Sequence, residues 1–473
     1  MTKRSKPRRM SLRSRVATTA AKAATWASRR TGRGSGGMIG GLVAQKLDPG
    51  ILGQLGGDRP AAIITGTNGK STTTRMLAAA MRAAGDRVAT NEGGDNMDAG
   101  VISALMAGPD ADTLVLEVDE LHVAHISADL KPKVLVLLNL SRDQLDRVGE
   151  INKIERSLRA AVDANPQATV IANCDDPLIA SAAWDAERVV WVSAGGGWTN
   201  DATSCPRTGG PIIRDGDRWH AVKKLDDGSD FARPTPSWTI TPEGIESPFG
   251  TTIPLNLTLP GDANRGNATL ATAAAVELGA EATVAASATE GVDNVAGRYS
   301  TVRVGDHEVR MLLAKNPAGW QEALSMVDRD ADGVVIAVNG HVADGEDLSW
   351  LWDVVFENFG GMSVKAAGER GTDLAVRLVY AGIEHQLLHD PLEAIEACPP
   401  GRVEVLANYT AFRDLKKAIE RGADRDSARG SNQGTEGDSA GNSERDSERS
   451  TENPTGRTIE DSTDHGTERG SND

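Results

Sequence analysis

The sequence is poor in cysteine, in aromatic residues and in long apolar runs. It holds three cysteines in 473 residues, Cys174, Cys205 and Cys398. They are far apart and odd in number, which excludes a disulfide framework and fits a reducing compartment. No apolar run reaches the length of about eighteen residues that indicates a transmembrane helix. The formal net charge of −16 argues against a general nucleic-acid binder, because contacts with phosphates need a cationic surface.

The two ends of the chain depart from this average composition. Residues 1–34 contain many lysines and arginines and no acidic residue, and they lack the apolar core of a secretory signal. Three interpretations remain open: a transit peptide, a basic helix on an anionic membrane surface, and a solvated helix that leads into the first domain. Residues 424–473 have almost no apolar side chains, so the sequence predicts a disordered tail there.

Between the two ends, short β-rich runs alternate with helical segments, which is typical of α/β proteins. The runs PAAIITG, TLVLEVD, KVLVLLNL and ATVIANCDD predict a parallel sheet in a first domain, residues 35–296. Residues 185–260 are rich in Gly, Pro, Trp and Thr and predict an insertion of loops and short strands. The runs VRMLLAK, GVVIAVNG, MSVKAAG and RVEVLANY predict a smaller, Rossmann-like α/β domain, residues 297–423.

The clearest chemical signal is ITGTNGKSTTT, where a buried strand runs into a glycine-rich loop and then a helix. Backbone N–H groups of such a loop face a phosphate, and the helix N-terminus adds its dipole. Lys70 supplies a positive charge, and the Ser71 hydroxyl is placed to bind Mg²⁺. The general phosphate-loop spacing is not met, because Ile64 stands where its first glycine belongs. The predicted ATP-binding residues of this loop are Gly66, Thr67, Asn68, Gly69, Lys70, Ser71 and Thr72.

A carboxylate follows a later predicted strand. Glu117 lies at the end of the strand predicted by the run TLVLEVD, and ligands of α/β sheets bind at the carboxyl edge of the strands. It is therefore the predicted second Mg²⁺ ligand beside Ser71, and a solvated acid at a strand end is the alternative. Together with Lys70 it would hold phosphate, metal and a substrate carboxylate in one place.

The loop GTNGKS resembles that of the Mur ligase family, and further motifs of the family follow in order. These are NEGGDNMDAG (91–100), LEVDE (116–120), NLSRDQLDRVGE (139–150), NCDDP (173–177), GDANRGNATLATAAA (261–275) and GRY (297–299). LLAKNPAGW (312–320), ADGEDLSWLWD (343–353) and ANYTAF (407–412) follow, and the first two are similar to the MurT-type members of the family. The resemblance spans about residues 35–420 and implies a Mur ligase-type central domain followed by a MurT-type C-terminal domain.

The resemblance implies ATP-dependent, Mg²⁺-assisted amidation of the D-glutamate α-carboxylate in the lipid II stem peptide, through an acyl phosphate. Asn264 and Asn267 match the family's adenine-side asparagines, and Arg298 matches the arginine that reaches the nucleotide phosphates. Gln144 and Leu158 stand where amino-acid-adding ligases have a metal-binding histidine and a carbamylated lysine. The alternatives are another Mur-like amide ligase, amino-acid-adding or folylpolyglutamate synthase-like, and a nucleotide-binding module without catalysis.

The resemblance also implies a partner that supplies ammonia, a separate GatD-type glutaminase subunit. The cysteines of this chain fit that division of labour, because none lies in a nucleophile elbow with an evident His and acid. Asp347 matches the aspartate that completes the partner's Cys–His pair, with Asp344 and Asp353 as alternatives. A helix cap for LSWLWD is the structural interpretation of Asp347. A lipid II substrate would place the protein in the cytoplasm, at the inner face of the membrane.

Residues 203–224 resemble a four-cysteine zinc ribbon that MurT-type sequences often carry. Cys205 remains, while Thr208, Ala221 and Lys224 stand at the other ligand positions. His220 would add a second ligand, which is still too few for tetrahedral zinc. The sequence therefore predicts a degenerate ribbon that is kept by packing and holds no zinc.

Overall fold

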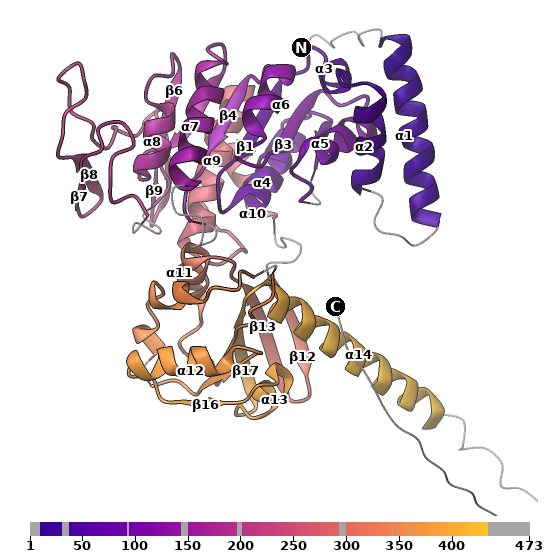
Figure 1. Cartoon of the computed structure of the whole chain (residues 1–473), viewed down its shortest axis with the longest axis vertical. Coiled ribbons are helices and arrows are strands. Elements are labelled where there is room, and N and C mark those ends of the chain that lie inside the picture. The colour runs from indigo at the N-terminus through magenta and orange to yellow at the C-terminus, as the bar shows by residue number, and fades with distance from the viewer. Residues whose placement is uncertain are drawn as a thin grey trace, which may run out of the picture. The chain divides into compact units, whose positions relative to one another are not determined.

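The structure is a computed structural model that describes residues 10–30, 37–91, 94–142, 150–195, 201–292, 299–342, 344–359 and 361–433. Their strands form a nine-stranded, a six-stranded and a two-stranded sheet, and helices pack on the two larger sheets (Figure 1). None of the helices in these ranges combines the length and the apolar character that a membrane span requires.

The first large sheet and its helices occupy the chain up to α10. In order, the elements are α1 (Leu12–Arg30), α2 (Gly37–Leu47), α3 (Ile51–Gly56), β1 (Ala61–Thr65), α4 (Lys70–Ala83), β2 (Val88–Thr90), α5 (Asp98–Ala107), β3 (Thr113–Glu117), α6 (Val123–Leu130), β4 (Val134–Leu137), α7 (Glu150–Asp163), β5 (Thr169–Asn173), α8 (Pro177–Ala183), β6 (Val189–Ser193), β7 (Ile212–Asp215), β8 (Arg218–Ala221), β9 (Trp238–Thr241), β10 (Gly244–Glu246), β11 (Thr252–Ile253), α9 (Asp262–Leu278) and α10 (Ala282–Glu290).

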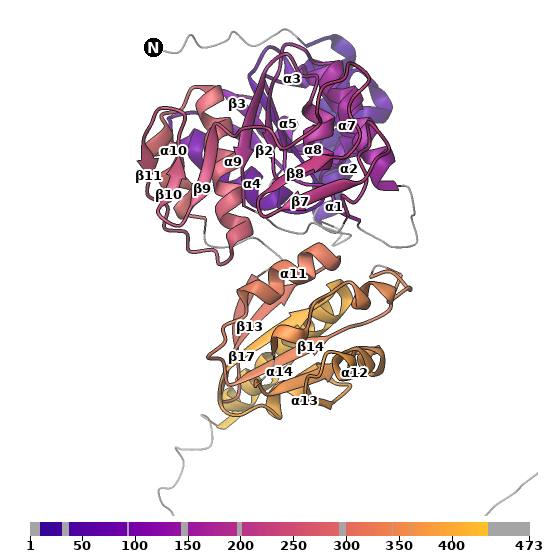
Figure 2. The ribbon, with the colours of Figure 1, turned by 90° about the vertical axis from the view of Figure 1, so that its left-hand side faces the viewer.

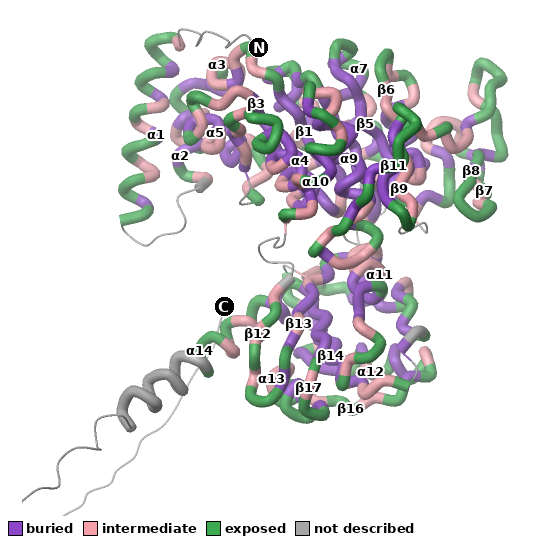
Figure 3. Tube along the Cα trace, turned by 180° about the vertical axis from the view of Figure 1, so that it is seen from behind, coloured by how far each residue is buried: buried purple, intermediate pink, exposed green. Residues whose placement is uncertain are grey.

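The strand order of this sheet is β11-β10-β9-β6-β5-β4-β1-β3-β2, and the strands from β9 to β2 run parallel. Successive side chains of a strand point to opposite faces, so each face needs its own cover. Ala61 and Ile63 of β1 join a core with α6, α7 and α8, while Ala62 and Ile64 join a second core with α4 and α9. The buried strands between the two helix layers are visible in Figure 3.

The segment 185–260 contains short strands, as predicted, but most of them belong to the main sheet and do not form an insertion. Its strand β6 pairs with β5, and β9, β10 and β11 continue the main sheet beside α9 and α10 (Figure 2). Among the described strands of this segment, β7 and β8 form a separate antiparallel hairpin. The sequence did not indicate that these strands join the main sheet, because strands this short carry no pattern that identifies their pairing partner.

The second large sheet uses strands from the later part of the chain. Its elements are β12 (Tyr299–Val304), β13 (His307–Leu313), α11 (Pro317–Met326), β14 (Gly333–Ala337), the 3₁₀ turns η1 (Ser349–Trp352) and η2 (Glu357–Phe359), β15 (Val364–Ala367), α12 (Gly371–Tyr380), β16 (His385–Leu387), α13 (Pro391–Glu396), β17 (Gly401–Ala407) and α14 (Tyr409–Gln433). The order is β12-β13-β17-β14-β15-β16, with β12 antiparallel and the others parallel.

Helix α14 corrects the predicted start of the tail. It continues past residue 423 to Gln433, so the first residues of the predicted disordered segment are helical. Ala411, Phe412, Leu415 and Ile419 pack the first turns of α14 against the core of the second sheet. Residues 434–473, the rest of the predicted tail, lie outside the described residues.

Candidate active site

The glycine-rich loop leaves β1 at the carboxyl edge of the first sheet and enters α4 at Lys70. Gly66 and Gly69 have φ angles of 138° and 84°, which side chains disfavour. A Cβ on Gly69 would also lie 2.6 Å from the Asn267 Oδ1 atom. Only glycine fits this close approach. The first amides of α4 have no acceptor within their own helix, which is what an anion site at a helix N-terminus requires.

A short segment after β4 holds the loop in place. The Thr67 amide donates to the Asn139 carbonyl at 2.9 Å, and the Asn68 amide donates to Asn139 Oδ1 at 2.9 Å. Asn139 Nδ2 donates back to the Asn68 carbonyl at 3.0 Å. The Ser141 amide donates to Thr67 Oγ1 at 3.0 Å. Asn139 and Ser141 open the motif NLSRDQLDRVGE, for which the sequence predicted no separate role. Their contacts hold the phosphate loop in its binding conformation.

Lys70 turns back onto its own loop and meets an acid that the sequence patterns did not single out. Its Nζ donates to the carbonyls of Gly66 at 2.5 Å and Thr67 at 3.2 Å. It also lies 3.2 Å from Glu120 Oε1, and both side chains are buried. Burial raises the pKa of Glu120, while the Lys70 charge opposes this shift. Glu120 is the last residue of the LEVDE motif, and its position in that motif is the signal that could have found it.

Glu117 is buried rather than solvated, so the alternative interpretation as a solvated strand-end acid is wrong. Its exposed fraction is 3%, and the pairing of Ile64 with Glu117 sets it beside the strand that feeds the loop. Asn96 Nδ2 donates to Glu117 Oε1 at 3.3 Å, and the backbone of Glu117 is held by Asn91. Its Oε2 is buried and has no hydrogen-bond partner among the described residues.

An unpartnered buried carboxylate oxygen is costly unless a cation neutralises it. Magnesium takes oxygen ligands and is commonly held by one or two carboxylates together with substrate phosphates. Glu117 therefore fits a metal ligand in its chemistry. Ser71 is half-buried at the start of α4, directly after Lys70.

The two asparagines predicted on the adenine side lie at the start of α9, where this helix meets the loop. Asn264 Nδ2 donates to the Pro260 carbonyl at 2.6 Å, and Asn267 Nδ2 lies 3.4 Å from Asn264 Oδ1. Both side chains are buried, and Asn267 is the residue that a side chain on Gly69 would meet. Arg298 lies outside the described residues, so its predicted contact with the nucleotide stays a prediction.

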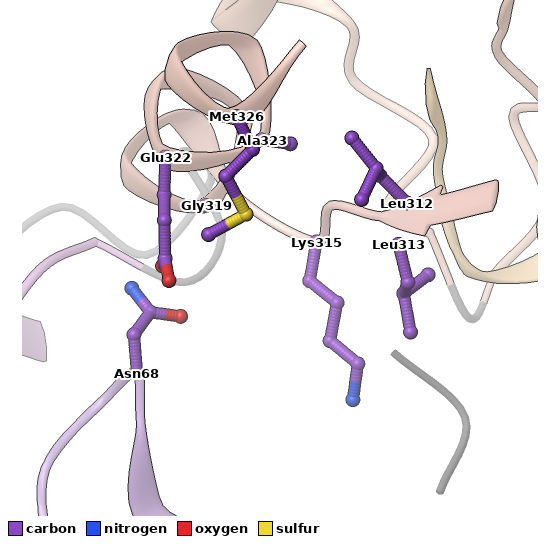
Figure 4. A pocket seen from close by; sticks show the side chains of 8 residues that line it. All are labelled: Asn68, Leu312, Leu313, Lys315, Gly319, Glu322, Ala323 and Met326. Atoms are coloured by element: carbon purple, nitrogen blue, oxygen red, sulfur yellow. The ribbon is translucent and has the colours of Figure 1, made fainter. Parts of the chain in front are cut away.

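The LAKNPAGW motif contributes a pocket at Asn68, which Figure 4 shows from close by. The lining residues are Asn68, Leu312, Leu313, Lys315, Gly319, Glu322, Ala323 and Met326. The amide of Asn68 pairs with that of Asn316, with N–O distances of 3.4 Å in each direction. Asn316 also caps α11 through a 2.8 Å bond from the Gly319 amide. This motif is therefore a structural neighbour of the phosphate loop, which its sequence alone did not indicate.

The three candidate aspartates near η1 have different environments. Asp344 accepts hydrogen bonds from the amide and the hydroxyl of Thr410. Asp353 lies 3.6 Å from the Arg142 guanidinium. Asp347 is exposed, and its Oδ1 accepts the Ser349 amide at 2.8 Å just before η1. The N-cap residue of η1 is Leu348 and it makes no side-chain cap bond, so Asp347 is not the cap and its bond to Ser349 closes a turn before η1. The exposed carboxylate of Asp347 is accessible to a second protein.

None of the three cysteines resembles an activated nucleophile. All are buried, and burial raises the pKa of Cys174 to about 12 and also raises the pKa of Cys398. Such thiols stay protonated at neutral pH. Cys205 packs with Trp219 and Phe231 in a small apolar cluster at the β7–β8 hairpin. The likeness to a degenerate zinc ribbon, and its lack of zinc, stay predictions.

An open α/β sheet with a phosphate loop at its carboxyl edge defines a class of nucleotide-binding proteins. Within that class, the family model of the Mur ligase middle domain matches residues 64–275, and that of the MurT ligase C-terminal domain matches residues 313–412. Together with curated relatives that carry the MurT name, these two matches show that the chain belongs to the MurT family of Mur ligases.

The curated relatives include the lipid II isoglutaminyl synthase (glutamine-hydrolyzing) subunit MurT of Streptococcus pneumoniae. It is 28% identical over 448 residues, which cover 87% of this chain and 98% of the relative. The subunit of the same name from Staphylococcus aureus strain COL is 28% identical over 77% of this chain and 87% of the relative. A solved pseudomurein peptide ligase type C from Methanothermus fervidus has a TM-score of 0.61 at 16% identity, covering 77% of this chain and 79% of that one, and shows the shared fold.

Proposed function

We propose that this chain is the ligase subunit of an ATP-dependent amidating enzyme of peptidoglycan synthesis. Its substrate would be the D-glutamate α-carboxylate of the lipid II stem peptide, and its product D-isoglutamine. The buried, unpartnered oxygen of Glu117 beside the Lys70 loop supports this proposal. Such an oxygen suits a metal ion that also binds a phosphate held by the loop. The MurT-named relatives, matched over nearly their whole length, supply the substrate class.

The residues of the loop would bind and orient the phosphates of ATP. The amides at the start of α4 would face the anion, and Lys70 would neutralise charge that builds up during transfer. Ser71 and Glu117 would hold Mg²⁺, which screens the phosphate oxygens when it is bound. Asn264 and Asn267 would support the nucleotide from α9, and Arg298 would reach its phosphates. A carboxylate is a poor electrophile, and its acyl phosphate provides the leaving group that ammonia displaces.

Ammonia would come from a GatD-type glutaminase subunit. The high thiol pKa values of Cys174 and Cys398 support an external nucleophile. Asp347 would orient and charge a histidine of that partner. It is the aspartate best suited to this role, because Asp344 is engaged by Thr410 and Asp353 lies beside Arg142.

The second candidate is a Mur-like ligase that adds an amino acid. Such an enzyme would carbamylate a lysine where this chain has Leu158, and that side chain is fully buried in the apolar core of the first sheet. Gln144, where those enzymes have a metal-binding histidine, lies outside the described residues. The burial of Leu158 therefore favours amidation over amino-acid addition.

The test is glutamine- and ATP-dependent amidation of lipid II by the chain co-expressed with a class I glutaminase subunit. We expect Lys70→Ala to abolish amidation with glutamine and with ammonia. Asp347→Asn should abolish only the glutamine-driven reaction. Glu346→Gln changes an adjacent exposed acid and serves as the matched control. Amino-acid addition in place of amidation, or equal loss of both reactions in Asp347→Asn, would contradict the proposal.

A lipid II substrate would also bring the enzyme to the inner face of the membrane, in the cytoplasm. This location follows from the proposed substrate and from the membrane anchor that lipid II carries. Co-sedimentation of the subunit pair with lipid II-containing vesicles, compared with vesicles that lack lipid II, measures it.

A further inference from the structure

Helix α1 packs on the molecule through one narrow face. Ser14, Ala17, Ala21 and Ser28 are its buried residues, and their small side chains allow close contact with α2. Ser14 Oγ donates to Asp48 Oδ2 at 2.6 Å, and Arg13 Nε donates to the Leu47 carbonyl at 2.7 Å, which fixes the start of α1 at the end of α2. The outer face of α1 is left at the surface of the molecule (Figure 3).

The face opposite the buried one carries large apolar side chains. Leu12, Val16 and Trp26 are exposed by 77%, 59% and 65%, and exposed Thr19 and Ala23 lie between them. These positions are spaced by three or four residues, so they form one stripe along the helix. An apolar stripe that faces away from the core is not covered by this fold, which is typical of a surface that binds a membrane or another protein.

Cations border this stripe on one side. Arg15, Lys22 and Arg29 are exposed and repeat every seven residues, so they form a row that runs along the stripe. The helix contains no acidic residue, and the Arg30 guanidinium lies 5.6 Å from the centre of the Trp26 ring. Upstream, the sequence adds Lys3, Arg4, Lys6, Arg8 and Arg9, which lie outside the described residues.

We infer that the outer face of α1 binds an anionic membrane surface. A helix with a cationic row and an apolar stripe that includes Trp lies in the interface plane, with its apolar side chains at the acyl boundary and its cations at the anionic headgroups. Trp suits this depth because its ring is apolar and its N–H can stay hydrated. The positive charge of α1 is opposite in sign to the chain's net charge of −16. A negative surface therefore attracts this face and not the protein as a whole.

The test is sedimentation of the full chain with vesicles. One set contains about 30% phosphatidylglycerol in phosphatidylcholine and the other contains phosphatidylcholine alone. We expect the wild type to sediment with the anionic vesicles, to bind the neutral ones more weakly, and to be released by salt. Neutralising the row by Arg15→Gln, Lys22→Gln and Arg29→Gln together should weaken partitioning about 100-fold, since each cation near the surface contributes about one factor of five.

A matched variant separates this row from net charge. Lys133→Gln, Lys153→Gln and Arg156→Gln remove three exposed cations elsewhere on the same part of the chain and should leave binding unchanged. A second variant, Leu12→Ser with Val16→Ser and Trp26→Ser, should also lose binding and abolish the vesicle-induced shift of Trp fluorescence. All substituted side chains are exposed, so thermal unfolding should stay near that of the wild type.

Wild-type protein that stays in the supernatant with anionic vesicles would overturn the inference, as would a row variant that binds as well as the matched variant. If the outer face of α1 binds another protein instead, the wild type should stay in the supernatant. The inference does not rest on the proposed function. The α1 variants should still amidate a detergent-solubilised substrate as well as the wild type does. If the wild type shows no amidation at all, only the proposed function is contradicted.

Discussion

The Lys70 ammonium and the Glu120 carboxylate form a buried ion pair, with 3.2 Å between Nζ and Oε1, at the mouth of the phosphate loop. A bound phosphate would offer Lys70 a second anionic partner, so under the proposed function this pair is the contact that Lys70 makes before ATP binds. Glu120 would then hold the Lys70 side chain in place until the nucleotide binds.

We predict that Glu120→Gln destabilises the nucleotide-free protein by about 3 kcal/mol, because it leaves a buried charge without its partner. With saturating ATP and Mg²⁺ the loss should be smaller, since phosphate replaces the carboxylate. Thermal or urea unfolding with and without nucleotide measures both values. An equal loss in the two states would show that Glu120 has a structural role only, and Glu346→Gln is the exposed control.

A different outcome is expected for Glu117→Gln. The neutral amide removes the charge of a carboxylate whose Oε2 is buried and unpartnered, so stability in EDTA should be equal to or higher than that of the wild type. The gain in melting temperature on adding Mg²⁺ and ATP should largely disappear. If Mg²⁺ and ATP still stabilise the variant as strongly as the wild type, Glu117 is not the metal ligand.

Gly69→Ala tests the close approach of the loop to α9. A positive φ alone costs a side chain about 1–2 kcal/mol. Gly85 has a φ of 98° and open space where a Cβ would stand, whereas a Cβ on Gly69 would lie 2.6 Å from Asn267 Oδ1. We therefore expect both alanine variants to lose stability and only Gly69→Ala to lose ATP binding, by tenfold or more at about 1.4 kcal/mol per decade, as read by nucleotide titration. Loss of binding in Gly85→Ala would point to a general effect of unfolding.

Asp176 gives a prediction for pH. It accepts the Leu140 and Leu178 amides, at 2.7 and 2.8 Å, and burial raises its pKa from 3.8 to about 6. The folded protein then binds more protons than the unfolded chain between these two pH values, so this group's contribution to stability falls as pH rises from about 4 to about 6. The stability advantage of the wild type over Asp176→Asn should therefore shrink between pH 4 and pH 7 in urea unfolding. A constant or growing advantage would contradict the raised pKa.

The sequence alone predicted the elements with strong local signals. The apolar run before Gly66 and the helix after Lys70 were predicted correctly, because strand propensity, glycine and helix formers all agree there. It predicted short strands in residues 185–260 but not that β9 to β11 join the main sheet, because strands of two to four residues are fixed by pairing with a neighbour. It also placed the start of the tail too early, because the polar composition beyond residue 423 is that of a disordered segment although α14 continues to Gln433.

What the sequence determined by itself is the chemistry that is contiguous in the chain: a loop with glycines, Lys70 and Ser71 between a strand and a helix. Only the tertiary structure decided which distant groups join it. Glu120 reaches Lys70, Asn139 and Ser141 hold the loop, Asn267 covers Gly69 and Glu117 keeps one oxygen without a partner among the described residues. The physical reason is that local backbone preferences depend on neighbours in sequence, whereas charge pairing and burial depend on strands and helices that parallel-sheet topology brings together across tens to hundreds of residues.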